Sequence, residues 1–303
     1  MSPKPGMMKI GLHGKFFENK YCGFIQQIFD SLHQHAIEIY VSDEFNQVIA
    51  NTIVSTGQVD IFYRGQDIST FDYMLSIGGD GTFLDTITYI RHYQIPILGI
   101  NTGRLGFLAS TTQDSFAEAI EQLFQQNIQY ENRTLIHLDC KPDIFNGLNF
   151  GLNEFAILKK DTSSMIVVHT YIDDDYLNSY WADGLIVATP TGSSGYSLSC
   201  GGPFILPNSH NFVITPISPH NLNVRPMVVD DNSIIKLKVE GRSENFLASL
   251  DSRSKTIDAQ MQLTLRKENF TVKIVKFNNL TFFDTLRQKL HWGLDNRNWT
   301  NNN

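Results

Sequence analysis

Residues 72–84 read DYMLSIGGDGTFL and join three local patterns in thirteen positions. The apolar run at 73–77 has the length of a strand, three glycines follow it, and apolar residues then recur at helical spacing from Phe83 onward. The stretch therefore predicts a strand, a glycine turn and a helix. Such a turn exposes backbone N–H groups at the start of a helix, an arrangement that suits a phosphate group.

Asp80 is the unusual residue of this turn, because a carboxylate repels a bound phosphate. A proton-accepting or cation-holding role would explain it. Aspartate is also favoured at the start of a helix, and taken alone the two explanations carry equal weight. The glycines on both sides favour a functional role, since capping a helix needs only one of them.

The turn matches neither of two common nucleotide-binding motifs. Gly79-Asp-Gly81 begins the pattern G-x-G-x-x-G, but Leu84 stands at the third glycine position, and the chain contains no G-x-x-x-x-G-K-[ST]. Gly-Gly-Asp-Gly-Thr resembles instead the phosphate-site motif shared by phosphofructokinases, diacylglycerol kinases and NAD kinases. That resemblance implies a kinase that phosphorylates a hydroxyl group.

Composition limits the partners and the compartment. The 303 residues carry a net charge of 24 − 31 = −7 and no basic block, so we expect no nucleic-acid partner. No apolar run reaches transmembrane length and the leader 1–7 lacks a signal-peptide core, so we expect no membrane partner. Cys22, Cys140 and Cys200 are far apart and form no C-x-x-C, which favours a reducing cytoplasm.

The first part of the chain alternates strand and helix patterns, which predicts parallel β-α-β units. Ligands of such sheets bind at the carboxyl ends of the strands. The glycine turn and a second glycine-rich turn at 101–107 would both lie there.

After about residue 130 the helical periodicity nearly vanishes and extended segments with one polar face take over, as at 232–240 and 261–266. We therefore expect an α/β N-terminal domain with a parallel sheet, residues 1–130, and an all-β, sandwich-like C-terminal domain, residues 131–277. A helical pattern returns with Phe283, Leu286, Leu290 and Leu294. We expect this final helix, within 278–303, to pack on the first domain.

A second candidate site lies at residues 183–203, DGLIVATPTGSSGYSLSCGGP. A buried strand there ends in a turn rich in small hydroxyl residues, which let a base and a ribose approach the backbone, and Tyr196 offers a stacking face. A polar loop whose hydroxyls cap their own backbone is the plainer explanation. That explanation fits a stretch of this length less well.

Six segments in family order resemble NAD kinases over roughly residues 72–251. They are the two glycine turns, Leu-Asn-Glu at 152–154, Asp-Gly-Leu-Ile-Val-Ala-Thr-Pro-Thr-Gly-Ser at 183–193, Tyr-Ser-Leu-Ser-Cys-Gly-Gly-Pro at 196–203 and Ser-Pro-His-x-Leu-x-x-Arg-Pro at 218–226. The resemblance implies transfer of the ATP γ-phosphoryl group to the 2′-hydroxyl of the adenosine ribose of NAD. It also implies Mg²⁺ or another divalent cation with ATP, and a homodimer or, more commonly, a homotetramer.

The resemblance also implies roles for individual residues. Asp80 would be the general base, which a weakly nucleophilic hydroxyl needs at neutral pH. The remaining residues would bind the substrates. They are Gly79, Gly81 and Thr82 at the phosphates, Asn153 and Glu154 at the adenosine, Asp183 at the nicotinamide side (from a neighbouring subunit), Thr191, Ser194, Gly195, Tyr196, Ser197, Leu198 and Ser199 around adenine and ribose, and Ser218, His220 and Asp251 beside them.

Three positions depart from the commonest family pattern. Trp181 replaces a frequent arginine, Gly195 a frequent alanine, and Ser252-Arg253 a frequent Gly-Gln, so roles are not carried beyond Asp251.

Three other functions compete with the NAD kinase interpretation. A lipid kinase shares the glycine turn but lacks the 183–193 segment, a phosphofructokinase does not explain the β-rich half, and a non-catalytic dinucleotide sensor does not need the carboxylate of Asp80.

Overall fold

A computed structural model describes residues 7–35, 37–103, 106–160, 164–277 and 281–291. They form two compact units, residues 1–131 with 272–303 and residues 132–271. The unit boundaries fall inside two long strands, β6 (Gln129–Asp139) and β17 (Leu263–Lys276). The leader through Gly6 and Leu294, which was expected on the final helix, lie outside the described residues.

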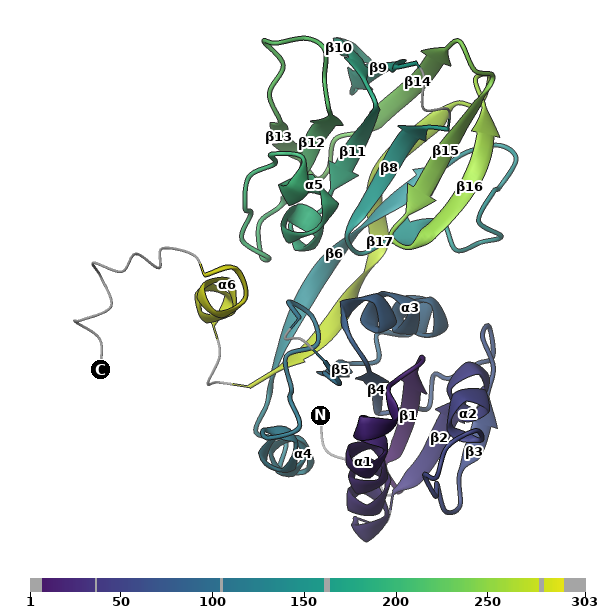
Figure 1. The fold of residues 1–303 in the computed structure, drawn as a ribbon, viewed down its shortest axis with the longest axis vertical. Coiled ribbons are helices and arrows are strands. Elements are labelled where there is room, and N and C mark those ends of the chain that lie inside the picture. The colour runs from purple at the N-terminus through teal and green to yellow at the C-terminus, as the bar shows by residue number, and fades with distance from the viewer. Residues whose placement is uncertain (1–6, 36, 104–105, 161–163, 278–280, 292–303) are drawn as a thin grey trace, which may run out of the picture. The chain divides into compact units, whose positions relative to one another are not determined.

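The first unit is built on a parallel sheet (Figure 1). At its centre Leu12 lies opposite Val41 on one side and Leu75 on the other. Every side chain of the strand before the glycine turn is buried, as expected for a strand covered on both faces. The strand order is β3 (Asp60–Phe62), β2 (Glu38–Ser42), β1 (Lys9–Gly14), β4 (Tyr73–Ile77) and β5 (Ile97–Ile100), and the end of β17 pairs with β5 at Ile274.

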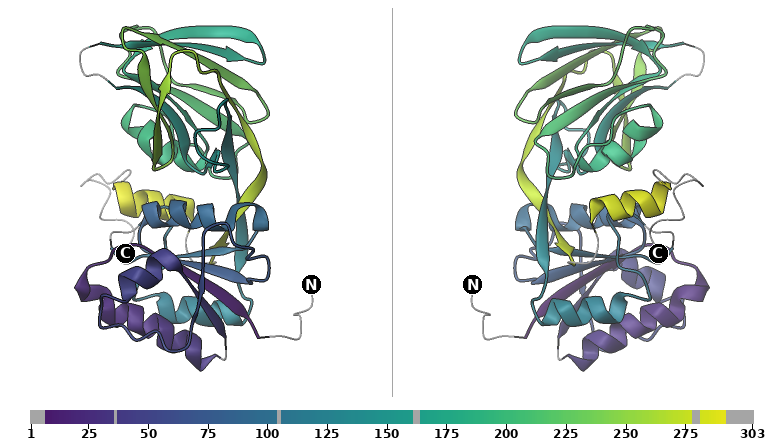
Figure 2. Two further views of the ribbon diagram at one scale, coloured as in Figure 1. Left: turned by 90° about the vertical axis from the view of Figure 1, so that its right-hand side faces the viewer. Right: turned by 90° about the vertical axis from the view of Figure 1, so that its left-hand side faces the viewer.

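Helices cover both faces of this sheet. On one face α1 (Cys22–Gln34) and α4 (Phe116–Phe124) share a core with the strands, because their apolar residues recur on one side of each helix. On the other face lie α3 (Asp80–Ile90) and α6 (Phe282–Leu290), as Figure 2 shows. The remaining short helices are η1 (Asn19–Tyr21), α2 (Asp43–Ile49) and η2 (Arg91–Tyr93).

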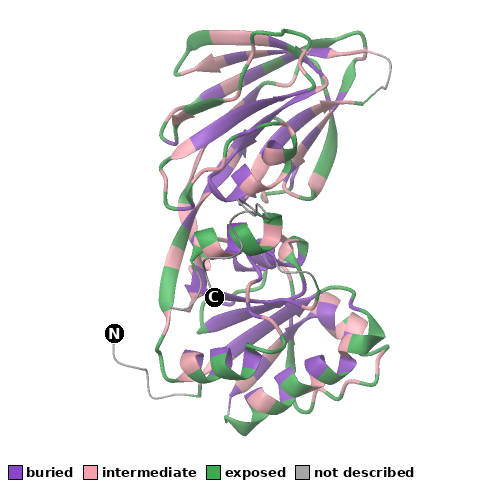
Figure 3. Ribbon diagram, turned by 60° about the vertical axis from the view of Figure 1, so that its left-hand side comes forward, coloured by how far each residue is buried: buried purple, intermediate pink, exposed green. Residues whose placement is uncertain are grey.

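The second unit is a sandwich of antiparallel sheets. One core collects residues of both sheets, among them Val168 and Leu237 from the first and Phe155 and Phe246 from the second, and the buried strands stand out in Figure 3. The first sheet holds β10 (Asp175–Ala182), β9 (Ile166–Ile172), β14 (Ile235–Gly241), the start of β17, β6 and β7 (Phe150–Gly151). The second holds β13 (Met227–Asp230), β12 (Asn211–Ile217), β11 (Gly184–Ala188), β8 (Glu154–Lys159), β15 (Asn245–Leu250) and β16 (Arg253–Asp258).

These observations confirm the predicted fold class, with its mainly parallel N-terminal sheet, its antiparallel C-terminal sheets and its final helix. Residues 44–54 have a helical pattern in the sequence, and the helix found there, α2, ends at Ile49. Asp173 and Asp174, both with positive φ, form the turn between β9 and β10, and Asp175 begins β10. No described helix has the length and apolar character needed to cross a membrane.

Candidate active site

The glycine turn of the first unit leaves the start of α3 open. Gly78 has φ 153°, and a Cβ atom there would lie 2.3 Å from Thr82 Oγ1, so only glycine fits. Gly79 and Gly81 differ, since a Cβ atom on either would meet no described atom within 4 Å. No side chain of the described residues caps the helix at Gly79. The packing of the described residues thus gives no reason for these two glycines, and a ligand that approaches the backbone would.

Asp80 joins the two glycine-rich turns. Its Oδ2 accepts a hydrogen bond from Phe107 N at 2.9 Å, and its Oδ1 accepts from Leu108 N at 3.0 Å and Ala109 N at 3.1 Å. A Cβ atom on Gly106 would lie 2.0 Å from Asp80 Oδ1, so this glycine makes room for the carboxylate. The sequence placed both turns at the same sheet edge, and the structure brings them into direct contact.

A third element reaches the same carboxylate. Lys289 of α6 places Nζ 3.3 Å from Asp80 Oδ2 and 4.3 Å from the centre of the Phe107 ring. The two partners are 209 residues apart in the chain. Sequence reasoning missed Lys289, because it singled out only the apolar residues of the final helix.

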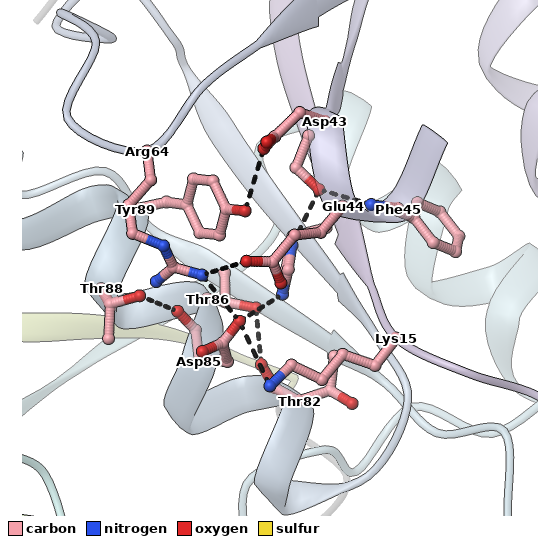
Figure 4. A network of polar contacts seen from close by, with 12 residues as sticks. Lys15, Asp43, Glu44, Phe45, Arg64, Thr82, Asp85, Thr86, Thr88 and Tyr89 are labelled. Atoms are coloured by element: carbon pink, nitrogen blue, oxygen red, sulfur yellow. Dashed lines mark hydrogen bonds and ion pairs between the residues drawn. The ribbon is translucent and has the colours of Figure 1, made fainter. Parts of the chain in front are cut away.

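A buried polar network holds α3 from the side, as the sticks in Figure 4 show. The fully buried His13 lies between Ser42, with Nδ1 2.8 Å from the hydroxyl, and Asp85, with Nε2 3.0 Å from Oδ2. Arg64 bridges Asp85 and Glu44 at 3.2 and 2.8 Å. The network ties α3 to β1, to α2 and to the loop after β3, one turn beyond the glycine turn.

The charges of this network favour an ionised Asp85. Burial alone would raise the pKa of this carboxyl group. The hydrogen bond from His13 and the charges of Arg64 and Lys15 outweigh burial and hold the pKa of Asp85 well below its usual range. His13, Glu44 and Asp85 offer ligand atoms within 4.8 Å of one another. Because Arg64 and Lys15 already contact the same carboxylates, we assign no metal to this group.

In the second unit, Asp251 clamps the strand start that carries Asn153 and Glu154. Its carboxylate accepts hydrogen bonds from Leu152 N and Asn153 N, both at 2.8 Å, and from Glu154 N at 3.2 Å. The peptide N–H of Asp251 donates to the carbonyl oxygen of Glu154 at 3.0 Å. The sequence placed Asp251 at the border of the site, and the structure makes it the residue that orients the Asn-Glu pair.

Among the described residues, none gives the buried Oε2 atom of Glu154 a hydrogen-bond partner. Burial first, and the nearby charge of Asp251 second, raise the pKa of Glu154 to about 8. Burial also raises the pKa of Asp251, but three N–H donors stabilise its carboxylate and oppose that rise. Of the two acids we therefore assign the proton near neutral pH to Glu154. A half-buried acid with an unpartnered oxygen suits a ligand that brings its own polar groups.

The hydroxyl-rich loop packs directly against this pair. A Cβ atom on Gly192 would lie 2.0 Å from the carbonyl oxygen of Asn153, and one on Gly195 would lie 3.2 Å from Glu154 Oε2. Thr191 Oγ1 accepts a hydrogen bond from the buried Arg133 at 3.1 Å. The loop comprises η3 (Thr191–Ser194) and α5 (Tyr196–Ser199).

The hydroxyls of the loop divide into two groups. Ser197 is buried and pairs with Thr215 at 2.8 Å, and Ser194 donates to the carbonyl oxygen of Thr191, so these two stabilise the loop itself. Tyr196 and Ser199 are exposed and Leu198 is partly exposed. The plainer explanation of the polar loop therefore holds for part of it, while Tyr196 remains available as a stacking face.

Asp183 and His220 lie in a separate pocket of about 520 Å³. Asp183 forms an ion pair with Lys159 at 2.6 Å, and the peptide N–H of His220 donates to the carbonyl oxygen of Trp181. Trp181, one of the departures from the family pattern, lines the same pocket. Ser218, which has φ 46°, is exposed at the end of β12.

The fold and these sites are typical of one class of protein, the nucleotide-binding kinases that combine an α/β unit with a β-rich unit. Two family models match the chain. They are the ATP-NAD kinase N-terminal domain over residues 10–128 and the ATP-NAD kinase C-terminal domain over residues 152–277. The chain belongs to the ATP-NAD kinase family.

Individual relatives agree with this assignment. The chain is 47% identical to a NAD kinase of Cytophaga hutchinsonii over 292 residues, 96% of this chain and 100% of that one. It is 45% identical to a NAD kinase of Flavobacterium psychrophilum, with the same coverage. Among solved structures it resembles a NAD kinase from Archaeoglobus fulgidus in complex with ATP (TM-score 0.71, 26% identity, 94% and 99% covered). A yeast NADH kinase complexed with NADH shares the fold (TM-score 0.83, 20% identity, 96% and 89% covered).

Proposed function

We propose that this protein transfers the γ-phosphoryl group of ATP to the 2′-hydroxyl of the adenosine ribose of NAD, which gives NADP and ADP. The two family models, one on each side of the domain boundary, support the reaction, and so do the NAD kinases that match nearly the whole chain. The ATP complex of the Archaeoglobus relative supports ATP as the donor. The first domain, residues 1–130 with 278–303, would carry the chemistry, and the second, residues 131–277, would bind NAD.

Asp80 is the general base in this proposal. The 2′-oxygen attacks the γ-phosphorus, the bond from that phosphorus to the bridging oxygen of ADP breaks, and the hydroxyl proton passes to the Asp80 carboxylate. The hydrogen bonds from Phe107, Leu108 and Ala109 fix the carboxylate in place, so no reorientation is needed during the reaction.

The phosphates lie at the start of α3 in this proposal, where Gly79 and Gly81 leave the backbone accessible and Thr82 stands in the first turn of the helix. A divalent cation, Mg²⁺ in the first instance, enters with ATP, whose phosphate oxygens are its preferred kind of ligand. When bound, it neutralises part of the negative charge on the transferring group.

The second unit supplies the recognition of NAD in this proposal. Asn153 and the protonated Glu154 hold the adenosine ribose, and the ligand supplies a hydrogen-bond partner for the Oε2 atom of Glu154. The loop residues Thr191, Ser194, Gly195, Leu198 and Ser199 surround the base, against which Tyr196 stacks, and the buried Ser197 holds the loop in place through Thr215. Ser218, His220 and Asp251 lie beside it.

The observation that carries the proposal is the open glycine turn around a fixed carboxylate, because this pair of features suits phosphoryl transfer to a hydroxyl group. Purified protein with ATP, Mg²⁺ and NAD should form NADP, read out with an NADP-specific dehydrogenase. Diacylglycerol and fructose 6-phosphate should stay unphosphorylated. Lipid phosphorylation without NADP would reassign the chain to a different activity.

We further propose a homo-oligomer, either a dimer or a tetramer, in which Asp183 serves the nicotinamide side of a neighbouring subunit's site. Light scattering measures the oligomer size. After subunit exchange, a mixture of Asp183→Ala and Asp80→Asn proteins should regain activity that neither has alone. A fully active monomer would exclude shared sites.

A further inference from the structure

We propose that Lys289 is a catalytic residue of the phosphoryl transfer. It occupies an acceptor position on Asp80 in the empty site and moves to the transferring phosphoryl group when the ribose hydroxyl takes that position. This inference rests on the proposed function, because it requires a phosphoryl group to arrive beside Asp80.

The acceptor capacity of Asp80 is the first argument. A carboxylate offers about four lone-pair positions. Three of them are occupied by the N–H groups of Phe107, Leu108 and Ala109, and the fourth by the ammonium group of Lys289. A hydroxyl that is to lose its proton to this carboxylate must therefore displace one of the four donors.

Lys289 is the donor that can leave. The three N–H groups belong to the backbone at the end of the second glycine-rich turn and directly after it, and the chain sets their position. Lys289 reaches Asp80 through a flexible four-carbon side chain that is 30% exposed, and its contact at 3.3 Å is the longest of the four. The exchange of this one donor opens Oδ2 without any backbone movement.

Charge decides where the ammonium group goes next. When a phosphoryl group arrives, two anions share the turn, and each disfavours the other at short range. Lysine binds phosphate oxygens as a point charge. The Phe107 ring, 4.3 Å below Nζ, gives the ammonium group a second favourable surface as it moves. The ammonium group of Lys289 thus compensates the negative charge of Asp80 in the empty site and that of the phosphoryl group once it is bound.

Replacing Lys289 with methionine tests the inference, because methionine keeps an unbranched stem against Phe107 and removes the charge. We expect kcat to fall by about 10²-fold, the loss typical of one group that stabilises transition-state charge. The KM for NAD should change by about threefold at most. Lys289→Arg, which keeps the charge, should stay within about tenfold of wild type. Arg287→Met is the matched control: Arg287 lies on the same helix, is exposed and pairs with Asp284, so it should turn over normally.

Measurements of ATP affinity distinguish a loss of charge compensation at Asp80 from a loss of the packing of α6. With Asp80 unchanged, the Lys289→Met substitution should weaken ATP binding about tenfold, because no cation then compensates the charge of Asp80 beside the phosphates. In an Asp80→Asn background the same substitution should weaken ATP binding less, by about threefold, because only the contact between the ammonium group and the phosphates is then lost. Equal losses in both backgrounds, or normal kcat in Lys289→Met, would overturn the inference. Wild-type protein is assayed in parallel, and a wild type that makes no NADP would refute the proposed function instead.

Discussion

The acidic residue in the glycine turn of the first unit and the one beside the hydroxyl-rich loop of the second differ in how their carboxyl oxygens are hydrogen-bonded. Asp80 accepts three backbone hydrogen bonds and contacts Lys289. Glu154 has an unpartnered, buried Oε2 and a pKa of about 8. Asp80 is held in place before any ligand arrives, whereas Glu154 is protonated and incompletely bonded.

This difference separates a site arranged for chemistry from one arranged for binding. A fixed carboxylate needs no reorganisation during the reaction, which favours catalysis. An unpartnered buried acid costs stability in the empty protein and regains it when a ligand supplies the missing partner. The four variants below test this division, and each has a different expected readout.

The largest effect is expected for Asp80→Asn, which removes the proton acceptor. General-base catalysis contributes about 10²–10⁴-fold, so kcat should fall by that factor. NAD affinity should change little. Asparagine has one acceptor oxygen instead of two, so Phe107, Leu108 or Ala109 loses its partner and stability falls by about 1–2 kcal/mol.

Steady-state kinetics, calorimetric NAD binding and a thermal melt separate these effects. Asp30→Asn is the control, since Asp30 is an exposed residue of α1 and pairs only with Gln26 among the described contacts. If Asp80 merely starts the helix, turnover of the Asp80 variant will be nearly normal.

Gly106→Ala should act through the position of the same carboxylate. Its Cβ atom would lie 2.0 Å from Asp80 Oδ1, so the carboxylate must shift. A misplacement of this size typically costs about 10²-fold in kcat. Gly103→Ala in the same loop is the control, because its Cβ atom would have its nearest neighbour at 4.0 Å. Equal turnover of the two variants would show that carboxylate position does not matter.

Asp85→Ala should cost stability rather than chemistry. It leaves His13 and Arg64 without their shared partner, at a cost of about 2 kcal/mol in urea unfolding after allowance for the partly exposed Arg64. The control Glu18→Ala breaks an exposed pair with Lys20 and should cost no more than about 0.5 kcal/mol.

The Asp85 effect has a defined pH dependence. The pKa of Asp85 is depressed in the folded state, so its contribution is present above the unfolded pKa of about 4 and is lost as the pH falls below it. The difference in unfolding free energy between wild type and Asp85→Ala should hold at pH 5–8 and shrink below pH 4. A difference that stays constant to pH 3 would exclude an ionic contribution.

Glu154→Gln should give the smallest effect, and only at higher pH. The pKa of Glu154 is raised from 4.5 to about 8 on folding, so wild-type stability is full below pH 4.5 and declines as the pH rises through 8. Glutamine does not titrate. The shift from 4.5 to about 8 corresponds to about 3.5 kcal/mol between pH 5 and pH 8. Because Glu154 is only partly buried, solvent reduces this, and the wild type should lose at least about 1 kcal/mol relative to the variant. Parallel stability curves would show that Glu154 is ionised in the folded protein.

Local pattern was enough to predict the strand, turn and helix at 72–84 and the change of fold class near residue 130. It was not enough for three strands of the second unit. The pairing of β10 shifts register between Tyr176 and Asn178, which breaks the alternation that marks a strand. The edge strand β16 buries only Ile257, and β13 has four residues, so neither carries an apolar pattern.

The residues missed at the candidate site depend on contacts between distant parts of the chain. Lys289 meets Asp80 across 209 positions, and His13 meets Asp85 only because β1 and α3 pack together. A lysine in an amphipathic helix and a histidine in a buried strand look ordinary in sequence. The motif residues were different, since the resemblance named them and the structure supplied their geometry.

The central claim is that the 2′-hydroxyl of the adenosine ribose loses its proton to Asp80 and receives the phosphoryl group. The most direct measurement compares NAD with its 2′-deoxyadenosine analogue as acceptor, with ATP and Mg²⁺, by phosphorus NMR of the products. The account predicts a new 2′-phosphate on NAD, no phosphorylation of the analogue, and competition by the analogue with NAD. Phosphorylation of the analogue, or a phosphate at any other position of NAD, would contradict it.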